Sequence, residues 1–387
     1  MRLVSRARRF AQLCREEPFR IFFPLGLLSG ATGVLLWPLF FLGWIDTYPA
    51  IPHARLLVQG FLSCFIFGFL GTAGPRVMSV PSFSGSELLR VLLPVISAWP
   101  LHLSGHHAVA DGLFLLGLSF FAISLVRRFR QRRDSPPPNF ALVGLGILNG
   151  LTGASLLFIC EVTNSSPNLQ RLGGALLNVG FGLLPLLGVA PFFLRKLLNP
   201  ESDDTPPTPH QRLRITGFAL FCGLAIDASL AVPIFATSSV IGWFAAVCAT
   251  AWLFISMPMR GNSILAGALR LSLAALPPAL GLIALLPAYR TSAWHILFIG
   301  GFSLAILSVA TRVVLGHSGH LALVRRRLVF LLIALLLLVL AMISRFVADF
   351  TETHDQHLLW GAVCWLVAVG IWALIVLPSI VVTEEEP

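Results

Sequence analysis

The sequence predicts an all-α fold, a polytopic membrane helical bundle of about 12 transmembrane helices with both termini cytoplasmic. Two observations lead to this prediction. Apolar residues form 56% of the chain and charged residues only 11%, whereas soluble domains are about 25% charged. Apolar stretches of about 20 residues, the length that crosses a bilayer as a helix, also recur without the strand-type alternation of a membrane β-barrel.

The expected spans follow one another along the chain. The first follows a basic segment and is long enough to cross the membrane. Because no small-residue cleavage motif follows it, we expect a retained anchor rather than a signal peptide. Pro94 and Pro100 interrupt the third span. In order, the spans are 21–44, 56–74, 88–104, 108–126, 140–160, 172–194, 215–236, 239–258, 264–286, 293–315, 328–348 and 358–380.

The distribution of Lys and Arg predicts the orientation of the bundle. The N-terminus and the even-numbered connections hold all but four of the 27 basic residues. Because cytoplasmic loops are enriched in Lys and Arg, both termini are expected in the cytoplasm. Contact of these loops with anionic membrane lipid accounts for the net charge of +10, so no nucleic acid partner is expected. The four exceptions are Arg55, Arg171, Arg290 and Arg345.

The chain is expected to form a single membrane domain, 1–387. A cytoplasmic linker at 200–212 divides it into two possible halves, 1–199 and 213–387, each with six spans. The six cysteines form no CxxC motif, which disfavours a zinc ribbon, a thioredoxin-type redox pair and covalently bound haem.

Histidines on the expected outer side are the first candidate site. His53, His295 and His357 stand at the outer ends of spans 2, 10 and 12. Imidazoles on neighbouring helices are the ligands that haem or copper needs in a helical bundle. For each histidine alone, a position facing lipid headgroups is the alternative. Taken together, the three favour a metal site.

Two further polar features lie outside that group. His102, His106 and His107 fall within one short segment, and His-rich segments can bind metal. Since Gly105 interrupts a helix there, a plain polar loop is the alternative. Asp227 lies in the middle of span 7, where a carboxylate is costly. It is expected to relay protons or to hydrogen-bond a ligand imidazole, or else to be a protonated group bonded to a neighbouring helix.

Five short segments resemble motifs of the NnrS family of bacterial membrane proteins. Residues 18–23, PFRIFF, resemble its PFRxFF opening, and residues 52–61, PHARLLVQGF, are similar to its WHAHEMxxGF segment. Residues 68–73, GFLGTA, look like its GFLxTA motif. Trp294-His295 and residues 311–319, TRVVLGHSG, look like its helix-10 histidine and its TRxxLGHxG ending. The resemblance covers essentially the whole chain.

This resemblance implies a haem- and copper-containing protein of the bacterial inner membrane, linked to nitric oxide and denitrification. It implies motif roles for His53, His295, Arg312 and His317, and more loosely for His357. On this basis we expect a haem b near the outer face, held by His53 with His295 or His357, and copper at the remaining histidines. The implied function is to bind or detoxify nitric oxide, or to protect against nitrosative stress. The sequence indicates neither a catalytic turnover nor a protein partner.

The chain also departs from the family pattern. Arg55, Leu56 and Leu57 stand where the helix-2 motif has its second His, its Glu and its Met. Because two potential metal ligands are lost, we interpret the chain as a divergent member in which one metal site is altered or absent. The segment from His102 to His107 is a candidate replacement.

The spacing of two motif histidines limits their roles. His295 and His317 are 22 residues apart on one expected helix, which is roughly 33 Å at about 1.5 Å per residue. They therefore belong to two sites, one at each membrane face, or one of them has another role. Arg312 precedes His317 by about one and a half turns, where it is expected to pair with a haem propionate or with lipid phosphate.

Two other functions remain open from the sequence. Six plus six spans is also a layout of secondary transporters, in which Asp227 would be the coupling carboxylate of a proton-coupled carrier. Against this, residues 74–87 lack the Gly-x-x-x-Asp-Arg signature of major-facilitator proteins. A non-catalytic membrane sensor or assembly factor with vestigial histidines is the third hypothesis, and the loss of the second helix-2 histidine favours it.

Overall fold

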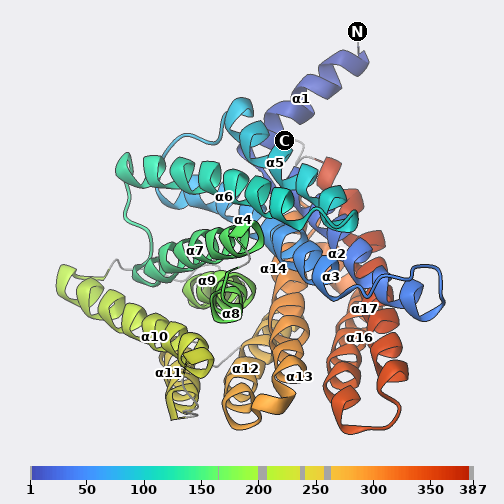
Figure 1. Cartoon of the computed structure of the whole chain (residues 1–387). Coiled ribbons are helices and arrows are strands. Elements are labelled where there is room, and N and C mark those ends of the chain that lie inside the picture. The colour runs from blue at the N-terminus through green and yellow to red at the C-terminus, as the bar shows by residue number, and fades with distance from the viewer. Residues whose placement is uncertain (1, 164, 199–206, 236–239, 257–262, 383–387) are drawn as a thin grey trace.

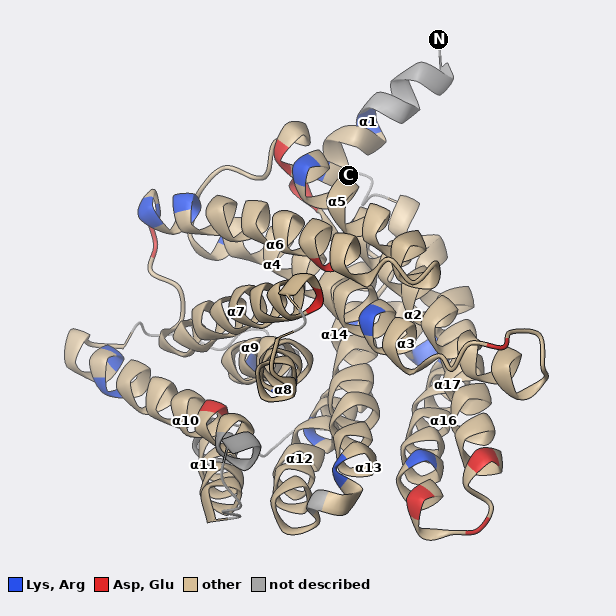
Figure 2. Ribbon diagram, viewed as in Figure 1, with Lys and Arg blue, Asp and Glu red and all other residues tan. Residues whose placement is uncertain are grey.

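The computed structural model describes residues 2–163, 165–198, 207–235, 240–256 and 263–382. Every regular element in these residues is a helix, because backbone groups in hydrocarbon must be bonded internally and a helix achieves this within one segment. The long helices pack side by side as a bundle (Figure 1), and charged residues lie mainly near helix ends (Figure 2). The expected all-α membrane bundle is confirmed.

Helices follow one another through short connections. Elements named η are 3-10 or π-helical. The first group is α1 Arg2–Glu16, α2 Phe19–Phe41, α3 Ala50–Arg55, η1 Leu56–Leu62, α4 Ser63–Val77, α5 Gly85–Leu103, α6 His107–Arg130, η2 Pro138–Phe140, α7 Ala141–Thr163, α8 Pro167–Ala175, η3 Leu176–Gly180 and α9 Phe181–Leu198. The second is α10 Pro209–Phe235, α11 Val240–Ser256, α12 Ile264–Leu285, η4 Pro287–Tyr289, α13 Arg290–His295, η5 Ile296–Ser303, α14 Leu304–His317, α15 Ala322–Arg326, α16 Leu328–Val347, η6 Ala348–Phe350, α17 His354–Val376 and η7 Leu377–Val381.

Ten helical segments in the described residues are long and apolar enough to cross a membrane. They correspond to ten of the twelve expected spans. The expected spans 88–104 and 239–258 correspond to helices α5 and α11, which are not among these ten. Helix α11 is apolar but shorter than the length required of a membrane span. Residues 200–206 of the expected linker lie outside the described residues. The count of about twelve and the cytoplasmic termini stay predictions, as do the two halves.

The α5–α6 hairpin begins and turns where its sequence indicates. Ser84 and Glu87 form a capping box at the start of α5, which satisfies backbone N–H groups that a helix start leaves free. Hydrogen bonds from Arg128 on α6 lower the pKa of Glu87 to about 2. Gly105 adopts a φ of +81° between the helices, a conformation that favours glycine. The predicted interruption at Gly105 is therefore confirmed.

Three π-helical segments, η1, η3 and η5, occur in spans 2, 6 and 10. Two of them end at a serine whose hydroxyl donates to the carbonyl five residues earlier: Ser63 to Val58 at 2.6 Å, and Ser303 to Phe298 at 3.1 Å. These bonds help satisfy carbonyls in the wider turn. Such π-bulges occur frequently at functional sites.

The bundle contains two buried apolar cores. One extends through α4 to α12, and the other joins α2, α14, α16 and α17. Segment η1 contributes Val58 to the first core and Phe61 to the second, whereas η5 contributes Phe302 to the first and packs Ile299 against the second. The site described next lies at this junction.

Candidate functional site

A cavity of about 470 Å³ lies between η1, η3 and η5 and the helices α2, α16 and α17. Its volume falls in the range of cofactor and small-molecule sites, about 300–1,000 Å³. Polar groups are few, and aromatic side chains form much of the wall. These aromatic residues are Trp37, Tyr48, Phe61, Trp294, Phe298, Phe302 and Trp365.

His53 reaches this cavity from the end of α3. Its Nδ1 lies 3.0 Å from the carbonyl oxygen of Gly33 on α2. Because a carbonyl can only accept, Nδ1 carries the proton and Nε2 keeps a free lone pair. Gly33 allows the close approach of α2, since a Cβ there would meet Leu57 at 2.6 Å. Trp37 packs edge-on against the imidazole at 5.9 Å.

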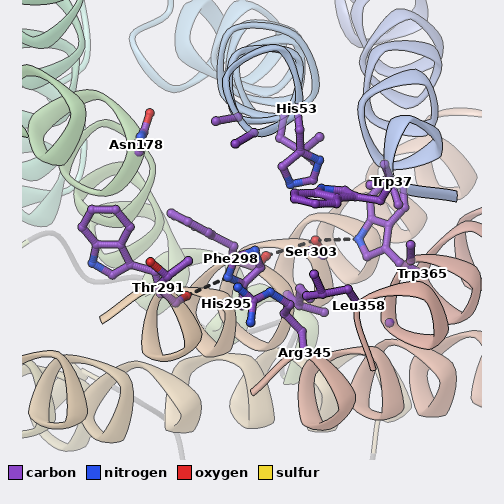
Figure 3. Close-up of a pocket in the computed structure, with 18 of the residues that line it drawn as sticks. Trp37, His53, Asn178, Thr291, His295, Phe298, Ser303, Arg345, Leu358 and Trp365 are labelled. Carbon is purple, nitrogen blue, oxygen red and sulfur yellow. Dashed lines mark hydrogen bonds between the residues drawn. The ribbon is translucent and has the colours of Figure 1, made fainter. Parts of the chain in front are cut away.

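His295 reaches the same cavity from the end of α13. Its Nδ1 lies 2.7 Å from the carbonyl oxygen of Thr291, so this imidazole has the same tautomer as His53. Neither Nε2 has a hydrogen-bond partner in the described part of the chain. The two imidazoles project toward the same space from opposite walls, with Arg345 beside His295 (Figure 3). The structure thus brings together two of the three histidines that the sequence placed at helix ends.

The third, His357, does not line the cavity. Its Nδ1 lies 3.2 Å from Ser344 Oγ, and Ser344 Oγ also donates to its carbonyl at 2.9 Å. His354, one turn earlier in α17, lines the cavity instead. There its Nε2 lies 3.1 Å from Asp349 Oδ1.

A polar edge closes one side of the cavity. Asp349 lies against Ser292 and His354, and Arg345 Nη1 stands 3.5 Å from Asp349 Oδ1. Elsewhere on the wall, Trp365 Nε1 donates to Ser303 Oγ at 3.1 Å. This edge combines a guanidinium and a carboxylate with otherwise apolar walls.

Behind η1, on the side away from the cavity, lies a buried polar network. Arg55 forms an ion pair with Asp111 at 2.9 Å, and Gln59 Nε2 donates to the same carboxylate. His102 Nε2 lies 2.9 Å from Gln59 Oε1, and its Nδ1 lies 3.2 Å from His107 Nδ1. All of these side chains except His107 are buried. The positive charge of Arg55, which stands where the resembled motif has its second histidine, is thus paired with a buried carboxylate.

Of the three clustered histidines, the structure brings together His102 and His107, whereas His106 is exposed at the start of α6. Across the described residues, no group of three or more His, Cys, Asp or Glu side chains is arranged to hold a metal ion. His102 and His107 together therefore offer two nitrogen ligands to a metal ion.

His317 lies in a separate cluster near both ends of the chain. Its Nδ1 stands 2.6 Å from Glu17 Oε1, and the Arg76 guanidinium lies against its ring at 3.0 Å. Burial raises the pKa of Glu17, but hydrogen bonds from His317 and Arg76 outweigh this and lower it to about 2. Arg20 joins Glu17 at 2.6 Å and donates to the carbonyl of Val382 at 2.9 Å. We call the face with this cluster the termini face and the opposite one the cavity face.

Two other predicted residues lie apart from the cavity. Arg312 is partly buried on α14 and makes no hydrogen bond or ion pair with a described residue. Asp227 on α10 accepts a hydrogen bond from Asn149 Nδ2 at 2.6 Å. This contact is the interhelical hydrogen bond that the sequence left open beside a proton relay.

The sequence pattern did not single out Asn178, Arg345, Asp349 or His354, which all line the cavity. Arg345 carried a signal, because it is one of only four basic residues that break the charge alternation. Arg55, another of the four, is also buried in an ion pair. An isolated Arg in a connection on the expected outer side, where basic residues are few, was therefore the sequence signal for a buried polar site.

Comparison with known proteins identifies the family. A family model described as "NnrS protein" matches residues 14–382. A search of curated proteins gave no match. Because the matched region is nearly the whole chain, this protein belongs to the NnrS family.

Proposed function

We propose that this protein binds haem b in the cavity through His53 and His295, and binds or detoxifies nitric oxide there. Family membership links the chain to the nitric oxide response in general. The observation that carries the haem proposal is the state of the two imidazoles. Both face one cavity, and a backbone carbonyl holds each Nδ1–H so that Nε2 is available. A metal-binding histidine is usually oriented by such a bond from its other nitrogen.

The remaining walls also suit a haem. Aromatic side chains such as Trp37, Phe61 and Phe302 offer flat apolar surface, which excludes water from an apolar ring system. The two histidines come from different helices, as ligands do in helical bundles. A bound haem would supply the iron, and nitric oxide would bind there in place of one of the two imidazoles. The protein contributes two neutral nitrogen donors in one fixed tautomer and a dry pocket.

The proposal includes a location in the bacterial inner membrane, with the cavity face outside. The charge distribution supports this orientation. Arg76 ends α4 on the termini face, whereas His53 begins the same span on the cavity face. Because basic residues favour the cytoplasmic side, the haem would lie near the outer surface.

Purification after haem-replete expression tests this function. We expect a haem absorption band in the detergent-purified protein, and a shift of that band when nitric oxide is added under anaerobic conditions. A protein that folds and yet shows no such band would exclude the haem. Haem uptake without a response to nitric oxide would exclude the nitric oxide part of the proposal and leave the haem part standing.

Copper at His102 and His107 is a second part of the proposal. Since Asp111 accepts from the Gln59 amide nitrogen, the Gln59 carbonyl faces His102 Nε2, which must carry a proton. His102 Nδ1 then accepts a hydrogen bond from His107 Nδ1, and both nitrogens could bind a metal once His107 carries its proton on Nε2 instead. The two Nδ1 atoms stand 3.2 Å apart, and a metal bound by both would need the pair to open.

Elemental analysis tests the copper site. We expect about one copper per chain in the wild type, and its loss in His102→Ala. The matched control is His106→Ala, which removes the exposed neighbour and should leave the copper in place. Equal copper contents in all three proteins would exclude this site.

A further inference from the structure

We infer that Arg345 is the residue that anchors an anionic group of the cavity ligand, namely a propionate carboxylate of the haem. The inference rests on the proposed haem function and deepens it. It moves the expected anchor from Arg312 to a residue that the family motifs do not include.

The position of Arg345 is the first argument. Its side chain is only 14% exposed and lines the cavity from the end of α16. His53 and His295 line the same cavity. Figure 3 shows the guanidinium next to His295. Among the described residues that line this cavity, Arg345 is the only one with a permanent positive charge.

The second argument is that the protein leaves this guanidinium poorly satisfied. Its two contacts, to Asp349 Oδ1 at 3.5 Å and to Ser292 Oγ at 3.4 Å, both involve Nη1. Charge-assisted hydrogen bonds are normally about 2.7–2.9 Å long. Nη2 and Nε have no partner in the described part of the chain. Since Arg offers five N–H donors in a planar fork, most of its capacity is free.

The neighbouring carboxylate of Asp349 does not bond the free N–H groups of Arg345, because its oxygens are bonded to other groups. Asp349 accepts from Ser292 through one oxygen, and its other oxygen lies 3.1 Å from His354 Nε2. A second carboxylate, brought by the ligand, can therefore bind the open side of the Arg345 fork in a bidentate manner.

The alternative anchor, Arg312, lies too far away. It follows His295 by 17 residues on the same span, which is roughly 25 Å at about 1.5 Å per residue. A haem held by His295 extends much less than this distance toward Arg312. Arg312 instead lies near the termini face, five residues before His317.

The experiment compares haem with haem dimethyl ester, in which both propionates are esterified and uncharged. Each is titrated into detergent-purified protein that lacks haem, and binding is followed by absorbance. We expect the wild type to bind haem about tenfold or more tightly than the ester, as loss of a charge-assisted hydrogen bond implies. Arg345→Gln should bind haem about as weakly as the ester. Arg345→Lys keeps the charge without the fork and should be intermediate.

Arg312→Gln is the matched control and should keep the wild-type preference for haem. The inference is overturned if Arg345→Gln keeps that preference, or if the wild type binds haem and ester equally. Both of those outcomes leave the haem proposal intact. Failure of the wild type to bind either compound overturns the proposed function and this inference together. Thermal unfolding of the apo variants verifies that each one is folded.

Discussion

His53 on the cavity face and His317 on the termini face both occupy family motif positions, but their imidazoles are held in opposite ways. A neutral carbonyl of Gly33 fixes the His53 ring and leaves Nε2 free beside a cavity. The His317 ring is enclosed by the Glu17 carboxylate and the Arg76 guanidinium. The comparison teaches that the hydrogen-bond partners of a histidine decide whether one of its ring nitrogens stays available, as the proposed haem function requires of His53.

The termini-face cluster has a clear structural role. Arg20, Glu17 and His317 connect the start of α2 with the end of α14, and Arg20 also binds carbonyls of residues 380 and 382. This arrangement ties the beginning of the described chain to its end. It answers the question raised by the spacing of His295 and His317, since only the former lines the cavity.

The largest expected effect separates the two faces by haem content. Replacing His53 or His295 with Ala should reduce the haem retained after purification about tenfold or more, because an axial ligand is lost. His317→Ala should retain haem, because its ring lies in the other cluster. Pyridine haemochrome assays on equal amounts of folded protein measure this. An equal loss of haem in His317→Ala would show that the two faces do not differ in haem binding.

The next effect concerns stability at the termini face. Arg20→Ala should destabilise the protein by about 1.5–3 kcal/mol, because it removes charge-assisted hydrogen bonds to Glu17 and to the carbonyl of Val382. Arg76 and His317 still bond Glu17 in this variant. Arg15 is exposed and five residues earlier, so Arg15→Ala is the matched control and should change stability by less than about 1 kcal/mol. Unfolding in detergent, followed by tryptophan fluorescence, gives both values. A loss in Arg20→Ala as small as the one expected for Arg15→Ala would show that Arg20 adds no stability through the cluster.

Acid should weaken the same cluster. The pKa of Glu17 is about 2 in the folded protein, below the roughly 4.3 of an unfolded Glu. Its contribution is therefore complete above about pH 4.3 and is lost as the pH falls toward about 2. Between about pH 6 and about pH 3, the melting temperature should fall more steeply in the wild type than in Glu17→Gln. Parallel curves would contradict this role.

The smallest expected effect is at His357. Because this residue does not line the cavity, His357→Ala should leave haem content within experimental error of the wild type. His354→Ala alters the polar edge at Asp349 and should weaken haem binding by only a few fold. A large loss of haem in His357→Ala would return it to the role that the sequence first suggested.

The sequence was sufficient for the fold but only partly sufficient for the site. Apolar length predicts the helices because a bilayer imposes it. His53 and His295 were predicted from their places at the outer ends of two spans and from motif resemblance, but His354 rather than His357 lines the cavity. Hydropathy does not fix the rotation of α17 within one turn, so the two could not be separated. The π-helical turns of η1 and η5 also shift which side chains face inward, and no residue pattern in the sequence specified them.

The coordination state of the haem-loaded protein tests the central claim most directly. If both His53 and His295 bind iron through Nε2, the wild type should give a six-coordinate, low-spin spectrum. His53→Gly and His295→Gly should each lose it, and added imidazole should restore it by occupying the vacated space. A low-spin spectrum that is unchanged in either variant without imidazole would contradict the claim that these two histidines hold the haem.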